Sequence, residues 1–239
     1  MNYKKDVIDS QKELKIITKN NIELITQAKY GPSKLTKIPL YLNEELAFLS
    51  GAIIGDGHLK KSKFQVTIEC TNKKLIEFLQ YICKVNFERK FNIRNVKLRK
   101  GKKASFAMGI DSKSIHNFLK EIFEIPIGKK SHIVKIPLHI FNSTKSIKSA
   151  FLMGIMMTEG GKRRRKIGLS TASMQLWKDL SLLFEELGIK ILKDKWIHKK
   201  YQKEYYGITF KPKYLSSLMR ECRSGQTGQI LIDNFKDYL

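Results

Sequence analysis

Ala47-Phe-Leu-Ser-Gly-Ala-Ile-Ile-Gly-Asp-Gly57 occurs twice in this chain, because Ala150-Phe-Leu-Met-Gly-Ile-Met-Met-Thr-Glu-Gly160 aligns with it without gaps. Alanine, phenylalanine, leucine and two glycines are identical in the two copies. An acid stands at the same place in each, Asp56 in the first and Glu159 in the second. The same tetrapeptide lies upstream of each copy, as Lys37-Ile-Pro-Leu40 and Lys135-Ile-Pro-Leu138. Two matches in the same order indicate an internal duplication.

The residues after each copy predict the same order of elements. In the first half we expect a strand over 63–70, a helix over 73–90, strands over 95–99 and 103–110, and a helix over 112–123. In the second half we expect a strand over 166–171, a helix over 173–187, strands over 189–199 and 205–211, and a helix over 212–222. We therefore predict four segments: a basic N-terminal arm (1–36), a first half (37–124), a linker (125–148) and a second half (149–239).

Small residues line one face of each repeated segment. Ala47, Gly51 and Gly55 are spaced four residues apart, and Ala150, Gly154 and Thr158 hold the same places in the second copy. In a helix this spacing makes a stripe along one face, which lets two helix backbones approach closely. We predict that the two helices pack on each other, with their acids side by side at the same end.

The two acids stand where a helix disfavours them. A carboxylate at a helix C-terminus costs about 0.3–1 kcal/mol, and two neighbouring carboxylates also repel each other. A divalent cation held by carboxylate and carbonyl oxygens would offset both costs, and oxygen ligands favour magnesium. The alternative is that Asp-Gly and Glu-Gly simply end two helices, since glycine is a common stop. Because the acid-glycine pair occurs twice, each time on a helix with a small-residue stripe, a metal site is favoured over two simple helix ends.

The formal net charge of +24 favours a nucleic-acid partner, because each neutralised phosphate releases counterions. A lysine-rich solvated surface is the alternative. The longest apolar run, residues 46–54, is far shorter than the roughly 20 residues of a membrane span, and the N-terminus shows no signal peptide. Three cysteines without metal-ligand spacing fit a reducing compartment, so we expect a cytoplasmic or organelle-matrix protein.

At this point the repeat resembles a known family. Residues 49–57 resemble the nine-residue signature of the LAGLIDADG homing endonucleases, and residues 152–160 look like its second copy. The resemblance covers about residues 37–223. It implies an α+β fold of two pseudo-symmetric αββαββα halves, with a central two-helix interface and saddle-shaped antiparallel sheets astride double-stranded DNA. It also implies an intron-encoded, monomeric, metal-dependent DNA endonuclease that needs no protein partner.

The same resemblance implies roles for residues near the two acids. Asp56 and Glu159 would be catalytic and would bind Mg²⁺, or Mn²⁺ or Ca²⁺ in its place, assisted by the carbonyls of Gly55 and Thr158. Lys162 looks like a basic catalytic residue near the scissile phosphates. The first half has Cys70 or Thr71 where another basic residue is expected, so Lys60, Lys61 or Lys63 could stand in. Glutamate replaces aspartate in the second signature, so the two metal sites need not be equivalent.

The strands predict a face that reads DNA. In residues 63–70, apolar residues alternate with polar ones, and the polar face is left open because the apolar face must cover helices. A two-stranded ribbon of this kind fits the major groove. The expected DNA-binding residues are Lys60, Lys61, Lys63, Gln65, Thr67, Glu69, Asn95, Lys97, Arg99, Lys103, Ser105, Arg163, Arg164, Arg165, Lys166 and Ser170. The sides of the strand at 193–199 stay unassigned, and the arm could touch DNA, cover the protein or be disordered.

Two other functions remain as alternatives. An RNA intron maturase, or another non-cleaving nucleic-acid-binding protein such as a transcription regulator, could use the same scaffold. Retention of both acids favours cleavage, because binding alone does not need them. An intein-embedded version is not expected, since residue 1 is neither Cys nor Ser and the chain closes with Phe235-Lys-Asp-Tyr-Leu239.

Overall fold

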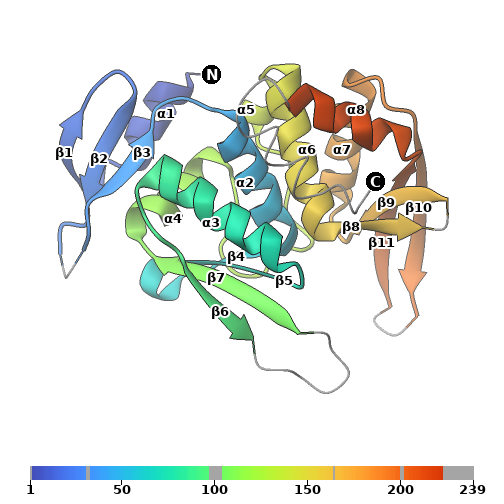
Figure 1. Cartoon of the computed structure of the whole chain (residues 1–239), viewed down its shortest axis with the longest axis horizontal. Helices are drawn as coiled ribbons and strands as arrows, with labels where there is room; N and C mark the ends of the chain where they lie inside the picture. Colours follow the sequence, from blue (N-terminus) through green and yellow to red (C-terminus); the bar gives the residue numbers. More distant parts are fainter. Residues whose placement is uncertain (1, 31–32, 97–103, 164, 200–201, 223–239) are drawn as a thin grey trace.

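Each half of the molecule has the expected order of elements. In a computed structural model, which describes residues 2–30, 33–96, 104–163, 165–199 and 202–222, the first half comprises α2 (Glu44–Asp56), β4 (Gly57–Leu59), β5 (Gln65–Cys70), α3 (Lys73–Phe87), β6 (Asn92–Val96), β7 (Ser105–Asp111) and α4 (Lys113–Ile122). The second half comprises α6 (Lys145–Glu159), β8 (Gly160–Arg163), β9 (Lys166–Thr171), α7 (Met174–Glu186), β10 (Ile191–His198), β11 (Lys203–Phe210) and α8 (Lys213–Glu221). Figure 1 shows the two αββαββα halves side by side.

Each half contains one four-stranded antiparallel sheet. The strand orders are β4-β5-β7-β6 and β8-β9-β11-β10, so the two sheets correspond strand by strand. We refer to them as the first sheet and the second sheet. The short strands β4 and β8 begin at the residue after each motif acid. A 3-10 turn, η1 (Ser62–Phe64), joins β4 to β5. The halves therefore share one topology, as the duplication predicted.

Polar residues set where most of these helices begin. The side chain of the residue before the helix accepts a hydrogen bond from the backbone N–H three positions further on, which satisfies a donor that the helix itself leaves free. The residues that do so are Asn43, Asn72, Ser112, Thr144 and Ser173, at the starts of α2, α3, α4, α6 and α7. The same local signal thus starts equivalent helices in both halves.

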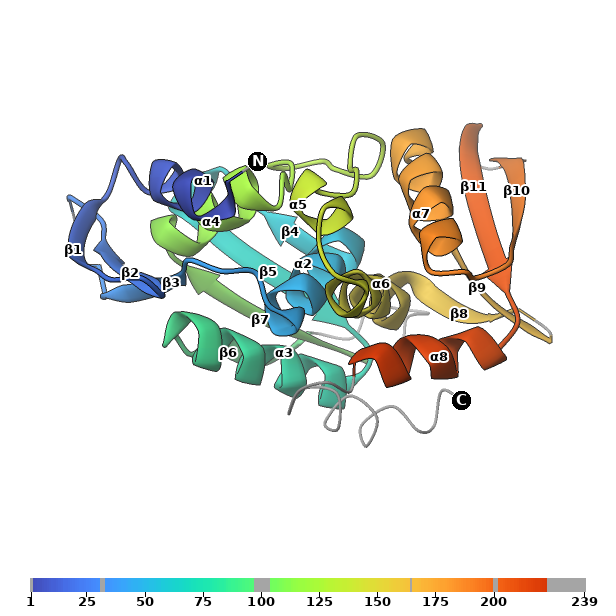
Figure 2. The same cartoon turned by 90° about the horizontal axis from the view of Figure 1, so that it is seen from above.

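The core is built around α2 and α6. Figure 2 shows these two helices side by side between the halves. Helices α3 and α4 pack on one face of the first sheet, while α7 packs on the second sheet and α8 on α6. Because α2 and α6 have protein on nearly every side, most of their residues are buried. None of the described helices has both the length and the apolar content that a membrane crossing requires.

The N-terminal segment is not a free arm. It forms α1 (Tyr3–Ser10), β1 (Lys15–Lys19) and β2 (Glu23–Gln27), which join β3 (Thr36–Pro39) in a sheet of order β1-β2-β3. Val7, Leu24 and Ile38 are fully buried in the common core, and α1 packs on α4. These apolar contacts fold the segment, and β3 runs across the boundary expected at residue 36. We call residues 2–42 the N-terminal unit.

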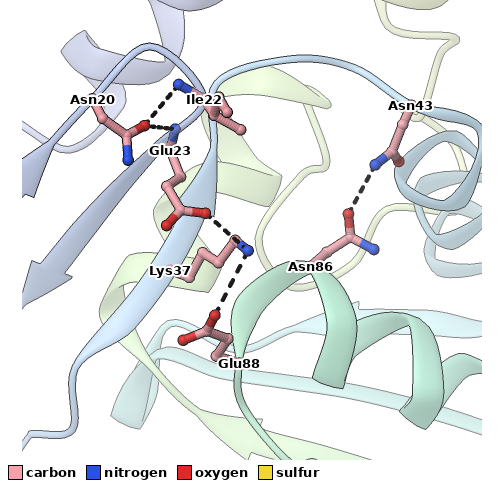
Figure 3. Close-up of polar contacts among 7 residues, drawn as sticks. All are labelled: Asn20, Ile22, Glu23, Lys37, Asn43, Asn86 and Glu88. Atoms are coloured by element: carbon pink, nitrogen blue, oxygen red, sulfur yellow. Dashed lines mark hydrogen bonds and ion pairs between the residues drawn. The ribbon is translucent and has the colours of Figure 1, made fainter.

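Polar contacts fix this unit to α3 (Figure 3). Lys37 on β3 lies between Glu23, at 2.8 Å, and Glu88, at 3.6 Å, just after the end of α3. Asn43 donates its side-chain amide N–H to Asn86 Oδ1 at 3.0 Å. The Lys37–Glu88 and Asn43–Asn86 contacts thus join the N-terminal unit, and the residue that follows it, to the end of α3. These contacts set the orientation of the unit relative to the first half.

Candidate active site

The two motif helices touch through their glycines. A Cβ atom placed on Gly51 would lie 2.2 Å from the carbonyl oxygen of Phe151, and one on Gly154 would lie 2.1 Å from the carbonyl oxygen of Phe48. Real Cβ atoms essentially never come this close to another atom, so only glycine fits at either place. The predicted contact along the small-residue stripe is therefore confirmed.

The acids meet at the end of this contact. A Cβ on Gly55 would lie 2.1 Å from Thr158 Oγ1 and 3.1 Å from Glu159 Cγ, which places the last turns of α2 and α6 against each other. Asp56 and Glu159 are both exposed residues, but neighbouring protein atoms still shield part of each carboxylate from water. This partial desolvation, followed by repulsion from Glu159, raises the pKa of Asp56 from 3.8 to about 7. Burial also raises the pKa of Glu159. The two acids lie side by side, as predicted.

The glycines after the acids do not end the helices in the left-handed conformation. Gly57 has φ −83° and Gly160 has φ −82°, both with extended ψ, so the chain passes directly into β4 and β8. Glycine is needed because a Cβ at Gly57 would lie 2.5 Å from Ile53 Cα, and one at Gly160 would lie 2.3 Å from the Met156 carbonyl oxygen. A left-handed glycine stop does not account for the repeated acid-glycine pair.

Lys130 is a site residue that the sequence did not reveal. Its ammonium donates hydrogen bonds to the carbonyl oxygens of Ile54 and Gly55 at the end of α2. Burial lowers the pKa of Lys130 to about 8, although the negative charges of Glu159 and Asp56 act to raise it. Lys130 comes from the predicted linker, whose Gly128 N–H bonds to the carbonyl of Leu59 in β4. One lysine among many in a chain of net charge +24 cannot be singled out from the sequence. Lys130 reaches the acids only because the chain folds back to β4 at Gly128.

Glu159 opens onto the second sheet. It lines a hollow of about 440 Å³ together with the ends of both motif helices, the linker and β9. Its polar lining includes His58, Lys130, Glu159, Ser170 and Tyr205. Because Ser170 belongs to the predicted DNA-reading face, Glu159 and that face belong to one continuous surface.

On the first sheet, four predicted DNA-binding residues lie on the open face. Gln65, Thr67 and Glu69 alternate along β5 with the buried Val66 and Ile68. Ser105 lies on the same face and donates a hydrogen bond to Glu69 Oε1 at 2.7 Å. The alternation expected for β5 is confirmed.

The assignment of Asn95 to this face is wrong. Asn95 pairs with Phe106, which packs against the core, so Asn95 lies on the helix-covered side at an exposed end of the sheet. Strand β6 begins at Asn92, three residues earlier than expected, and Asn92 and Arg94 take the open face instead. The expected contacts Lys97, Arg99, Lys103 and Arg164 lie outside the described residues.

The basic residues expected near the acids are placed elsewhere. Lys162 pairs with Ile167 and lines a small hollow with Met156 and Leu215, on the helix side of the second sheet. The structure therefore does not bring Lys162 to the acids. Lys60, Lys61 and Lys63 lie at or beside η1, at the end of the β4–β5 hairpin away from Asp56. All three are exposed, which suits phosphate contact better than a place beside the acids.

Three expected residues, Arg163, Lys166 and Ser170, lie on the open face of the second sheet. Lys166 and Ser170 lie opposite the buried Ile167 and Leu169, and Arg163 donates a hydrogen bond to Ser170 Oγ at 3.1 Å. Arg165 is exposed in the turn between β8 and β9. These residues form the basic end of the open face.

The register also assigns faces that the sequence left open. Gly207 pairs with both Ser170 and Asp194, so Asp194 belongs to the open face, as does Trp196 two residues further along β10. Trp196 stacks on Tyr205 with ring centroids 6.1 Å apart. An aromatic pair therefore lies on the open face of the second sheet.

The raised pKa of Asp56 predicts a pH-dependent stability. Between pH 4 and 7, with no metal present, the folded Asp56 keeps a proton that the unfolded chain has lost, so stability falls as pH rises through this window. We therefore expect Asp56→Asn to melt at a higher temperature than wild type at pH 8 in a chelator, and the difference to vanish near pH 4. An equal difference at both pH values, measured by thermal unfolding, would contradict the assignment of the shift to Asp56.

The sequence pattern of the LAGLIDADG-like domain matches residues 43–122 and 146–235. This chain belongs to that family. The two matched regions correspond to the two halves of the fold, so the protein carries two copies of the LAGLIDADG domain in a single chain.

Two solved structures resemble this LAGLIDADG protein. The homing endonuclease I-DmoI in complex with DNA and Ca has a TM-score of 0.54 at 17% identity, over 77% of this chain and 91% of that one. Full-length DUF199/WhiA from Thermatoga maritima has a TM-score of 0.50 at 8% identity, over 82% of this chain and 62% of that one. At these identities the likeness shows the shared fold.

Two sequence relatives, both from Methanocaldococcus jannaschii, are much longer proteins. The replication factor C small subunit is 31% identical over 166 residues, which make up 70% of this chain and 9% of that protein. The probable translation initiation factor IF-2 is 26% identical over 183 residues, which make up 74% of this chain and 15% of that protein. This LAGLIDADG chain thus spans less than a fifth of the length of either relative.

Proposed function

We propose that this protein is a site-specific homing endonuclease that hydrolyses both strands of a long duplex DNA site with a divalent metal such as Mg²⁺. One observation carries the proposal: an acid from each half meets the other at the contact of the motif helices, between two sheets with open polar faces. Both helices of the interface come from one chain, so the enzyme acts as a monomer.

The charge and the shape of the open faces support duplex DNA as the substrate. The chain has a net charge of +24, and basic residues such as Arg94, Arg163 and Lys166 lie on the open faces. Phosphate contacts from such residues would provide affinity, while the polar strand residues beside them would read base edges. The two sheets would contact the two halves of one site.

The residues at the acids fit a hard divalent cation. No group of three or more His, Cys, Asp or Glu side chains lies together within the described residues, so backbone oxygens would have to complete a site. Asp56 and Glu159 would hold the ion with the carbonyl oxygens of Gly55 and Thr158, an all-oxygen set that suits Mg²⁺. Such an ion, when bound, polarises the phosphate and makes a bound water more acidic.

Lys130 places a positive charge close to both acids. Its ammonium engages the Gly55 carbonyl, so a cation at this oxygen would share it or compete for it with Lys130. Beside the scissile phosphate, that charge would stabilise the negative charge that builds up on the phosphate oxygens. With a pKa of about 8, Lys130 can also exchange a proton near neutral pH.

Replacing Lys130 with methionine tests this role. Methionine keeps much of the length of the side chain and removes its charge, so we expect the rate of DNA cleavage to fall about 100-fold while DNA affinity changes little. The control is Lys84→Met, which removes the same charge from an exposed position on α3, on the helix-covered side of the first sheet, and should cleave at the wild-type rate. Equal rates in single-turnover cleavage for both variants would exclude Lys130 from the chemistry.

The relatives support homing as the biological role. Their names describe unrelated activities, and in each the matched segment is a minor part of the protein. This distribution is expected of a segment that is carried within different hosts rather than one that serves their activity.

Cleavage of a randomised duplex library with Mg²⁺ tests the proposed function. Sequencing of the cut ends should return one long site with breaks in both strands. If the protein binds nucleic acid but cuts no sequence, the proposal fails. In that case an RNA maturase or a non-cleaving DNA-binding protein on the same scaffold becomes the better explanation, and assays of intron splicing and of duplex binding separate those two.

A further inference from the structure

The N-terminal unit lies outside the region that matches the LAGLIDADG-like domain, which starts at residue 43. Buried hydrogen bonds nevertheless fix it firmly to the first half. Thr26 donates its hydroxyl to Ser114 Oγ at 2.9 Å, and Gln11 donates its amide to the Ser114 carbonyl at 3.2 Å. Both views place the β1-β2-β3 sheet beside the first sheet, at the end away from α6 (Figures 1 and 2). The unit is thus a fixed extension at the outer end of the first half.

The segment between β2 and β3 shares a hollow with the open face of the first sheet. This hollow of about 770 Å³ is lined by Lys34 and Leu35 from the N-terminal unit, together with Thr67, Asn92 and Arg94 from the open face. Arg89 joins the two parts, because its guanidinium donates a hydrogen bond to Thr36 Oγ1 at 2.8 Å. The surface proposed to read DNA therefore continues onto the N-terminal unit.

Basic side chains gather at this junction. Lys29, Lys34 and Lys63 line an adjoining hollow of about 520 Å³. None of them forms an ion pair with any described residue. Two acids line the same hollow, but Glu13 pairs with Lys113 at 3.1 Å, and Asp111 accepts a hydrogen bond from Gln65 at 2.9 Å. The excess positive charge is available to an anionic partner.

An exposed aromatic ring completes this surface. Tyr30 is 90% exposed, and it lies directly after Lys29. A tyrosine that buries nothing in the free protein, next to unpaired lysines, suits contact with the sugar-phosphate backbone or with a base edge. The sequence from residue 28 to residue 35 contains no Asp or Glu, whose charge would repel a phosphate.

We infer that the N-terminal unit extends the DNA-contacting surface of the first half. Lys29, Tyr30 and Lys34 bind the backbone of the same duplex, at its outer flank beyond the base pairs that the first sheet covers. This inference rests on the proposed function in taking duplex DNA as the ligand, but it does not require that the DNA be cut.

The test combines a protein variant with a shortened duplex. The probe is the best duplex recovered from a randomised library by binding, without divalent metal, so that no cleavage occurs. The variant is Lys29→Ala/Tyr30→Ala/Lys34→Ala, and the charge-matched control is Lys15→Ala/Lys19→Ala on the exposed strand β1. Arg94→Ala identifies the flank that the first half binds, because hydroxyl-radical protection should weaken there.

The triple variant should bind the full duplex roughly tenfold more weakly at 0.1 M salt, and the slope of log affinity against log salt should become shallower by about 2. Shortening the duplex on the Arg94 flank should weaken wild-type binding about as much. The same shortening should change binding of the triple variant less than twofold, because the contact is already lost. The control double variant should lose affinity on shortening as wild type does.

Wild-type affinity and protection in the triple variant would overturn the inference, and so would additive losses from the variant and the shortened duplex. Neither result bears on cleavage, which the library experiment with Mg²⁺ decides separately. If wild type binds and does not cut, the proposed function fails, and the duplex-length measurement still decides the role of the N-terminal unit. If wild type binds no duplex at all, both proposals are wrong.

Discussion

Asp56→Asn is expected to abolish double-strand DNA cleavage while the protein stays folded and still binds its site. Asparagine keeps the shape of the side chain and removes the negative charge that would hold a divalent cation. The expected loss is several orders of magnitude in single-turnover rate, because a neutral amide is a poor ligand for Mg²⁺. Glu159→Gln should have an effect of similar size, since its carboxylate comes from the other half of the same site.

The loss expected for Asp56→Asn concerns cleavage alone, because the same substitution should stabilise the protein when no metal is bound. Burial and Glu159 raise the pKa of Asp56 to about 7, so its charge is unfavourable when no cation is bound. Removing that charge relieves the repulsion, and it also takes away one negative charge that faces the phosphates. Duplex binding without metal should therefore persist or tighten, and gel-shift titrations with and without Mg²⁺ would measure it.

A matched control separates the site from general charge effects. Asp111→Asn removes an acid from the end of β7. Asp111 pairs with Gln65 on the open face of the first sheet, away from Asp56. This variant should cleave at a rate close to that of wild type at saturating protein. Wild-type cleavage by both Asp56→Asn and Glu159→Gln would remove the proposed active site altogether. Nicking of one strand by either variant would show that each acid serves its own strand.

The duplicated eleven-residue stretch was enough to predict the helix interface and the place of the acids. Glycine at positions 51 and 154 has a local chemical meaning, because a side chain there cannot coexist with a touching backbone. Cap residues such as Asn72 and Ser173 likewise act on their own helix. Features that depend on near neighbours, or on one repeated contact, can be read from the sequence.

Features that depend on where distant segments meet could not be read in the same way. Asn95 was assigned to the wrong face because the register of β6 pairs Ile93 with the buried Met108, so Asn95, two residues further on, lies on the same helix-covered side. Lys130 reaches the acids only because its segment returns to β4 through Gly128. The N-terminal unit folds because Leu24 and other buried residues meet a core that the first half supplies.

Gly51→Leu and Gly154→Leu are expected to be the most destabilising substitutions at the helix interface. The new Cβ alone would lie 2.2 Å from the Phe151 carbonyl oxygen at Gly51, and 2.1 Å from the Phe48 carbonyl oxygen at Gly154. Neither obstacle is a flexible side chain, so the helices must move apart. We expect a loss of about 3 kcal/mol in the free energy of unfolding, and a melting temperature lower by about 6–12 °C.

The same separation should affect cleavage more than binding. Asp56 and Glu159 end the two helices, so a displacement of α2 against α6 moves the two carboxylates apart, while each sheet keeps its own fold. Below the melting temperature, the cleavage rate should fall further than duplex affinity. The control is Gly161→Ala, because a Cβ at Gly161 meets no other atom within 4 Å, and it should melt as wild type does. If Gly51→Leu melted and cleaved as Gly161→Ala does, the backbones of α2 and α6 would not be in contact. That contact would then not explain why the two acids lie together.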